Sequence, residues 1–163
     1  ILGGGGLVGR LPDALRQQRG LVYYASTGLS PMLLSATLIG SFATRNDQAK
    51  EALAVAQDVL KDSARQGFTT EEVENAKEYL IGSFPLELDS QHKRVGYLSS
   101  MQLYKLGADY LQKRNRYFAA VTLEDVNRVA AKWLAKTPLT VLVGQPDGIP
   151  LPKDQKGKQY GND

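Results

Sequence analysis

The chain of 163 residues is long enough for about one domain and too short for three. Its 42% hydrophobic and 23% charged residues exclude a disordered or collagen-like chain, and no apolar run approaches the roughly 20 residues of a membrane span. Twenty basic and 17 acidic residues give a net charge of +3, a mild excess that allows acidic partners without indicating nucleic acid.

The first third of the chain predicts a helix followed by a strand pair. Apolar residues recur at helical spacing from Leu7 to Leu15, and Arg19-Gly20 ends this helix. Residues 21–27 and 35–43 are typical of two strands, which we expect to be antiparallel. Turn signals between them, from Gly28 to Pro31, place the reversal there.

The middle of the chain changes to helical periodicity. Asn46 or Asp47 is expected to cap a helix that Gly67 ends. Thr69-x-x-Glu72 is a capping box for the next helix, which Pro85 should kink or stop. Helices are also expected over residues 90–106 and 109–120.

The last third predicts one more helix and a third strand. Thr122-x-x-Asp125 resembles a capping box for the helix, and residues 140–143 form the expected strand. The fold class is therefore α+β, an antiparallel-rich sheet covered by helices. Three strands are few for so many helices, and the chain begins at Ile1 without a methionine, so we expect a piece of a longer protein with part of its sheet missing.

Several catalytic motifs fail on inspection. Gly4-x-Gly6-x-x-Gly9 matches a dinucleotide fingerprint, but no strand precedes it and no acidic residue follows at the required distance. Ser90-x-x-Lys93 lacks the companion motifs of serine acylases. His92 is the single histidine and cysteine is absent, so no metal site is expected in this chain, and His92 is expected to be exposed near a helix cap. The dispersed basic residues favour a solvated face over a nucleic-acid patch.

Arg16 and Tyr23 are the most informative pair. Arg16 lies in the last turn of the first helix and Tyr23 near the start of the next strand, and Gly20 permits a reversal between them. A guanidinium beside a phenol could donate hydrogen bonds to a peptide carbonyl or its oxyanion. A surface arginine and a half-buried tyrosine would have the same spacing.

A series of short segments, in order along the chain, carries a family resemblance. The segments are Leu2-Gly3-Gly4-Gly5-Gly6, Gly9-Arg10-Leu11, Leu15-Arg16 through Arg19-Gly20-Leu21-x-Tyr23, Gly67-Phe68-Thr69, Leu80-x-Gly82-Ser83-Phe84 and Val121-Thr122-x-Glu124-Asp125-Val126. They resemble the C-terminal homologous domain of the pitrilysin, insulysin and mitochondrial processing peptidase family of zinc peptidases. The resemblance covers residues 1–147, a domain truncated at its start, and leaves 148–163 as a polar tail.

The resemblance implies a clam-shell assembly of two halves around a peptide substrate. One half, in the same chain or a partner subunit, carries zinc on an H-x-x-E-H motif, so zinc is expected there and not in this chain. The other half supplies an arginine and a tyrosine near the scissile bond, at the spacing of Arg16 and Tyr23. The glycine run matches a loop associated with substrate recognition: Gly3, Gly4, Gly5 and Gly6.

Two functions therefore remain open. The first is the substrate-binding half of a zinc metalloendopeptidase, which is not catalytic alone and works in a dimer or two-half assembly. The second is a non-catalytic structural or peptide-binding subunit of a larger complex. The absence of cysteine fits a bacterial cytoplasm and a periplasm equally well, so the compartment stays undetermined.

Overall fold

The computed structural model describes residues 1–4, 8–145 and 147–149. Its two strands are β1 (Val22–Pro31) and β2 (Ala36–Thr44). The helices are α1 (Arg10–Pro12), α2 (Ala49–Gln66), α3 (Thr70–Gly82), α4 (Gln91–Leu103), α5 (Tyr110–Ala119) and α6 (Leu123–Trp133). Shorter turns are the π-helical η1 (Asp13–Gln17) and the 3₁₀ segments η2 (Asn46–Gln48) and η3 (Phe84–Leu88).

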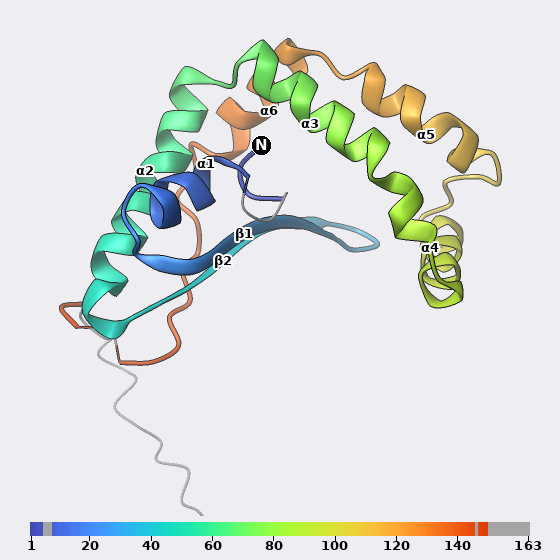
Figure 1. Ribbon diagram of the computed structural model, residues 1–163. Helices are drawn as coiled ribbons and strands as arrows, with labels where there is room; N and C mark the ends of the chain where they lie inside the picture. The colour runs from blue at the N-terminus through green and yellow to red at the C-terminus, as the bar shows by residue number, and fades with distance from the viewer. Residues whose placement is uncertain (5–7, 146, 150–163) are drawn as a thin grey trace, which may run out of the picture.

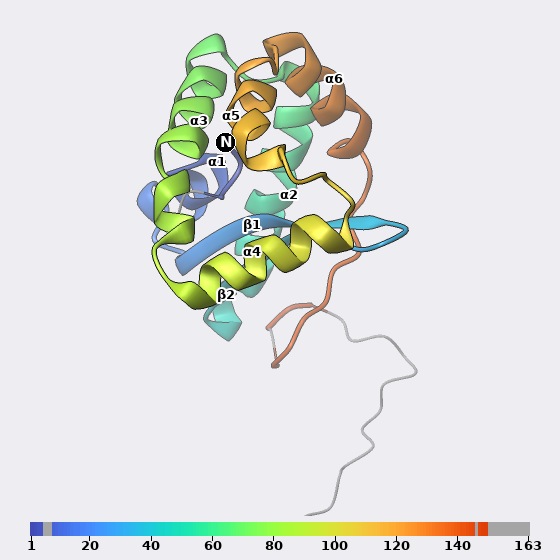
Figure 2. The ribbon, with the colours of Figure 1, turned by 90° about the vertical axis from the view of Figure 1, so that its right-hand side faces the viewer.

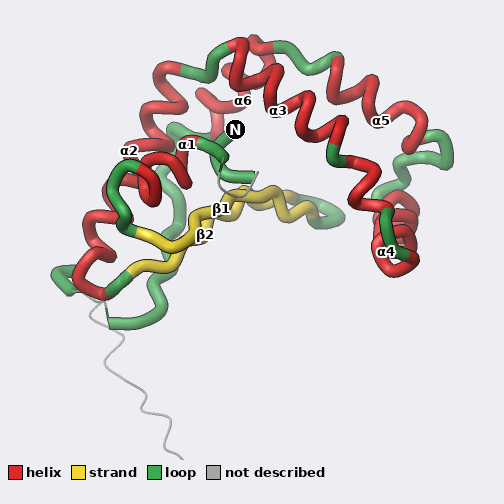
Figure 3. Tube along the Cα trace, in the orientation of Figure 1, coloured by secondary structure: helices red, strands yellow, loops and turns green. Residues whose placement is uncertain are grey.

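The helices form an arch over the β1–β2 hairpin. Figure 1 shows α2 beside one end of the hairpin, α3 and α5 side by side across the top, and α4 at the far end. Figure 2 shows α4 along its length in front of the hairpin, and Figure 3 shows that β1 and β2 lie beneath a chain made mostly of helices and loops. This arrangement of helices on an antiparallel pair confirms the predicted α+β class.

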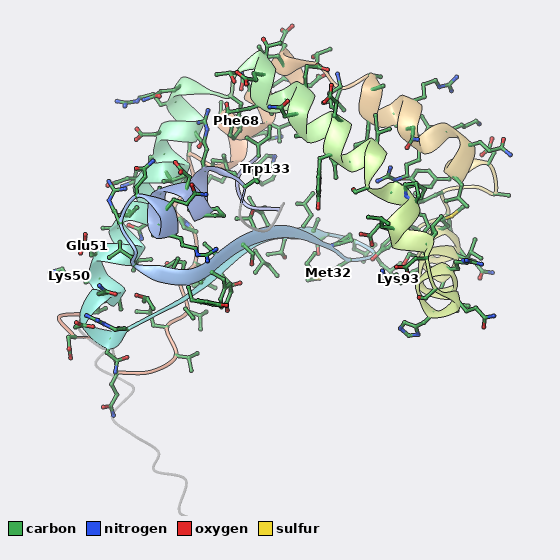
Figure 4. The ribbon with its side chains drawn as sticks, viewed as in Figure 1. Met32, Lys50, Glu51, Phe68, Lys93 and Trp133 are labelled. Carbon is green, nitrogen blue, oxygen red and sulfur yellow. The ribbon has the colours of Figure 1, made fainter. Side chains whose placement is uncertain are left out.

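The hairpin is longer than predicted, and its turn lies elsewhere. Gly28 pairs with Ile39, and Pro31 is the last β1 residue in the ladder, opposite Ala36. The predicted turn at residues 28–31 is therefore wrong, because the cross-strand pairing continues through these residues. The reversal occupies residues 32–35, where the Met32 N–H donates to the Ser35 carbonyl. Figure 4 shows Met32 at the end of the hairpin nearest α4, and the Tyr104 hydroxyl donates to the Pro31 carbonyl there (3.0 Å).

The first helix is shorter and wider than its periodicity predicts. Gly9 has a φ of 142°, and a Cβ there would lie 2.8 Å from the Leu2 carbonyl oxygen, so the helix begins only at Arg10. Pro12 is accommodated in the first turn. The helix then continues as the wider π-helical turn η1. The helical segment is closed by Gly20, whose φ is 63° and whose N–H donates to the Arg16 carbonyl.

Two apolar clusters hold these elements together. The first lies between η1, β1 and α2, around the fully buried Leu15, and contains Leu11, Leu21, Val22, Ala25, Ala52 and Ala56. The second lies where α2, α3 and α6 meet, and contains Phe68, Val73, Ala130 and Leu134. The apolar side of α2 is divided between them, since Ala56 joins the first cluster while Leu60 and Ala64 pack against the second.

The helix caps mostly follow the local sequence. Both capping boxes form as predicted, Thr69 with Glu72 and Thr122 with Asp125. The expected cap at Asn46 or Asp47 is wrong, because these residues form the 3₁₀ turn η2 before α2 and Asp47 pairs with Arg45 instead. Helix α3 ends at Gly82, three residues before Pro85.

The predicted third strand is not a strand in the described residues. Residues 140–143 have no ladder partner there, and the preceding Leu139 and the last residue of the segment, Val143, are 94% and 97% exposed. An extended segment becomes a strand only when a neighbouring strand satisfies its backbone groups. The segment is instead held at its end by the Asp147 N–H, which donates to the Asn46 carbonyl (3.0 Å).

Candidate functional site

Arg16 projects from the π-helical turn η1, next to the fully buried Leu15. Its carbonyl is held by the Gly20 N–H at 2.9 Å, and the Leu21 N–H donates to the Leu15 carbonyl at 2.8 Å. These bonds fix the backbone on which the guanidinium stands. Single π-helical turns are frequent at functional sites because they displace side chains from regular helical positions.

Tyr23 lies in a β-bulge. Val22 pairs with Thr44 and Ala25 with Phe42, so Tyr23 and Tyr24 together oppose the single residue Ala43. Val22 and Ala25 are buried while both tyrosines are exposed, Tyr23 to 83%. Bulges of this kind redirect side chains and are common beside active sites. The bulge therefore presents the Tyr23 phenol outward from a firmly packed strand.

The structure brings Arg16 and Tyr23 together. The guanidinium carbon lies over the Tyr23 ring, 5.6 Å from its centroid. In the described part of the chain no carboxylate pairs with Arg16, so its N–H donors are not committed to an ion pair. A planar cation on the face of an exposed phenol leaves two adjacent donor groups for a ligand.

A shallow hollow of about 500 Å³, largely open to solvent, lies beside Tyr23, where β1 begins and β2 ends. Arg45 and Gln48 line it together with the tyrosine. Arg45 is not identifiable as a site residue from the sequence, because only the antiparallel register places the residue after β2 next to the start of β1. The Thr44 hydroxyl, which donates to the Leu21 carbonyl (2.7 Å), ties the two chain segments together here.

The glycine run is described only at Gly3 and Gly4, and Gly5 and Gly6 lie outside the described residues. The Gly3 carbonyl accepts a hydrogen bond from the Thr27 N–H (3.1 Å), and a Cβ on Gly3 would lie 3.2 Å from that nitrogen. Gly3 thus packs against the free edge of β1, four residues or about 13 Å along the strand from Tyr23. The close approach explains the glycine at position 3.

Arg10 anchors the segment between the glycine run and Arg16. Its guanidinium binds both carboxylate oxygens of Glu72 on α3 (2.6 and 2.7 Å), donates to the buried Ser63 hydroxyl (3.2 Å) and lies 4.4 Å from the Phe68 ring centroid. Figure 4 shows Phe68 where α2 approaches α3. The hydrogen bonds from Arg10 hold the pKa of Glu72 below its usual range, although burial acts against them.

The donor set of the described residues does not fit zinc. No group of three histidine, cysteine, aspartate or glutamate side chains converges in residues 1–4, 8–145 and 147–149. His92 lies exposed on α4, next to the ion-paired Lys93. Within the same residues, no helix is both long and apolar enough to cross a membrane.

These observations define a helix-covered α+β domain in which Tyr23 lines a hollow and Arg16 lies against the Tyr23 ring. Residues 1–80 match the family model described as the peptidase M16 inactive domain. The chain belongs to the M16 peptidase family through this inactive domain. A crystal structure of the peptidase M16 inactive domain from Pseudomonas fluorescens superposes with a TM-score of 0.71 at 33% identity, covering 81% of this chain and 31% of that one.

Some related proteins are named as zinc proteases and one is named as a non-peptidase homolog. An uncharacterized zinc protease of Mycobacterium tuberculosis is 32% identical over 133 residues, which is 82% of this chain and 30% of that protein. A non-peptidase homolog of Helicobacter pylori is 25% identical over 126 residues, 76% of this chain and 29% of that protein. The chain therefore spans less than a third of the length of these relatives.

Proposed function

We propose that this chain is the substrate-binding half of a zinc metalloendopeptidase that acts on peptides, with zinc supplied by an H-x-x-E-H-bearing domain or partner subunit. The observation that carries the proposal is the contact between Arg16 and the exposed Tyr23 in the bulge of β1. Family membership and relatives named as zinc proteases support it. In this proposal residues 1–147 form the substrate-binding domain and residues 148–163 a tail.

Arg16 and Tyr23 would act on the carbonyl oxygen of the scissile peptide bond. The phenol and the guanidinium both donate hydrogen bonds, and the guanidinium also carries a full positive charge. As water adds to the carbonyl carbon, the oxygen gains negative charge, so both bonds become stronger in the transition state than in the ground state. The fixed backbone of η1 and of the bulge holds the donors in place before the substrate arrives.

The glycine run would contribute to binding the extended peptide. Gly3 and Gly4 lie along the free edge of β1, and Gly5 and Gly6 continue the run. Backbone without side chains lets a second backbone approach closely. A peptide along this edge would reach from the glycines toward Tyr23.

The test uses Tyr23→Phe in the complete assembly, with the zinc-bearing half present. We expect kcat to fall by about 10²–10³, which is the effect of removing one oxyanion donor. Because the hydroxyl is exposed, the free energy of unfolding should change by less than about 0.5 kcal/mol. Tyr24→Phe, the other tyrosine of the bulge, is the matched control and should keep wild-type turnover. Unchanged hydrolysis by the Tyr23 variant would refute the proposal.

A second function is favoured by one observation, the relative named a non-peptidase homolog. In that case the chain would be a structural or peptide-binding subunit without turnover. The assembly would then bind peptides but cleave none, and Tyr23→Phe would change only the affinity. Measuring hydrolysis and peptide binding in the same preparation separates the two functions.

A further inference from the structure

The hollow beside Tyr23 is lined by uncharged residues and one positively charged side chain, that of Arg45. Backbone at Gly20, the Tyr23 phenol and the Gln48 amide border it, and Arg45 is the charged residue of its lining. No acidic residue lines it among the described residues. Arg45, Tyr23 and Gln48 can therefore each donate a hydrogen bond to an acceptor in the hollow, beside the apolar side chains of Leu21, Val22 and Ala43.

The Arg45 guanidinium is held in place but is not saturated. Its Nε donates to one oxygen of Asp47 (3.0 Å) and its Nη2 to the other (2.6 Å). A guanidinium has five N–H donors, so three remain for a ligand. Holding the fork by a carboxylate on its own chain reduces the entropy lost when those donors bind a second acceptor.

The charge around the hollow is positive on balance. Asp47 neutralises Arg45, but Arg16 lies against Tyr23 at the same end of the sheet and has no carboxylate partner in the described chain. Arg45 thus offers its free N–H donors to a carboxylate in the hollow, and the nearby Arg16, which lies outside the lining, leaves the surrounding charge positive. A neutral amide of the same shape would gain only the hydrogen bonds.

We infer that this hollow is a side-chain subsite for an acidic residue of the bound peptide, and that Arg45 is the residue that sets this preference. The inference rests on the proposed function, because the peptide residue in the hollow is adjacent to the one whose carbonyl binds Tyr23. The volume, about 500 Å³, is larger than one side chain. The preference for an acidic residue therefore comes from charge and donors and not from size.

The experiment uses the complete zinc-bearing assembly and pairs of fluorogenic peptides that differ only in glutamate or glutamine beside the scissile bond, on either side. We expect wild type to prefer the glutamate peptide by about tenfold in kcat/KM, and Arg45→Gln to reduce this ratio to about one. Arg65→Gln is the matched control, because Arg65 forms a comparable ion pair with Asp62 and is 74% exposed against 71% for Arg45. The control should keep the wild-type ratio.

Peptide dissociation constants measured by fluorescence anisotropy on the same pairs provide a readout that needs no turnover. The same tenfold preference, lost in Arg45→Gln, is expected there even if the assembly cleaves nothing. An equal affinity of wild type for both peptides at both positions, or a ratio that Arg45→Gln leaves unchanged, overturns the inference. If Tyr23→Phe leaves hydrolysis intact while Arg45→Gln removes the glutamate preference, the proposed function fails and the subsite stands.

Discussion

The ion pair between Arg10 and Glu72 should contribute measurably to folding, and its energy can be worked out from the structure. Replacing Arg10 with methionine removes both bonds to Glu72, the bond to Ser63 and the stacking on Phe68. The two charged side chains are 27% and 29% exposed, so the pair lies between a surface pair and a buried one.

These two limits set the expected magnitude. A surface pair is worth about 0.2–1 kcal/mol, and breaking a buried pair costs about 3–5 kcal/mol. After a discount for solvent screening, Arg10→Met should lower the free energy of unfolding by about 2 kcal/mol. Glu72→Gln should cost about 1 kcal/mol, because glutamine keeps an acceptor for the Thr69 N–H that Glu72 now binds (2.7 Å). The coupling energy between the two positions should be about 1 kcal/mol.

The assay is urea unfolding followed by far-UV circular dichroism for wild type, both single variants and the double variant. Glu74→Gln is the control. Glu74 also lies on α3 and forms an ion pair with Lys77, but its carboxylate is exposed. That variant should change the free energy by less than about 0.5 kcal/mol. Additive single effects, with a coupling energy under about 0.3 kcal/mol, would refute the reasoning.

The pH dependence of the same coupling gives an independent check. The folded pKa of Glu72 is lowered, first by its hydrogen bonds from Arg10, so the pair stabilises the fold fully above the unfolded value of about 4.3. The stabilisation is lost as pH falls from there through the folded pKa. The coupling energy should therefore be constant from pH 6 to 7 and vanish at strongly acidic pH. A coupling that persists there would mean that packing and not charge joins the two residues.

Two further predictions concern the apolar clusters. Leu15→Ala removes the fully buried centre of the first cluster and should cost about 3 kcal/mol in the same urea assay, and a loss under 1 kcal/mol would show that the site collapses around the smaller side chain. Gly67→Ala should cost about 2 kcal/mol, because the φ of Gly67 is 74° and the new Cβ would lie 2.7 Å from the Asn127 side-chain oxygen. That oxygen accepts a hydrogen bond from the Phe68 N–H. Gly82→Ala, in open space at the end of α3, is the control and should cost less than about 0.5 kcal/mol.

The features that sequence predicted correctly depend on neighbours within a few residues. Each capping box joins a threonine to the residue three positions later, so the sequence alone specifies both partners. The reversal between Arg16 and Tyr23 is similarly local, since it depends on the positive φ of Gly20. The role that we propose for them at a scissile carbonyl comes only from the family resemblance, since the spacing alone favours a surface arginine and a half-buried tyrosine.

The features that sequence reasoning missed depend on partners distant in the chain. Gly28 and Pro31 are strong turn formers, yet pairing with β2 keeps both in the strand. Residues 140–143 have the composition of a strand, but a strand needs an edge to pair with, and no edge reaches them in the described residues. The position of Arg45 beside Tyr23 has the same kind of origin, because it follows from the register of the hairpin.

The candidate site combines two irregular segments that flank one glycine. Arg16 stands on a π-helical turn before Gly20, and Tyr23 stands in a bulge after it. A regular helix and a regular strand would each place these side chains by a fixed period, and the buried neighbours Leu15, Val22 and Ala25 would then decide their directions. The irregularities release both side chains from that constraint while the neighbours stay packed in the first cluster. A binding group gains precision when its supports are rigid, so the local irregularity and the tight cluster beneath it are two parts of one arrangement.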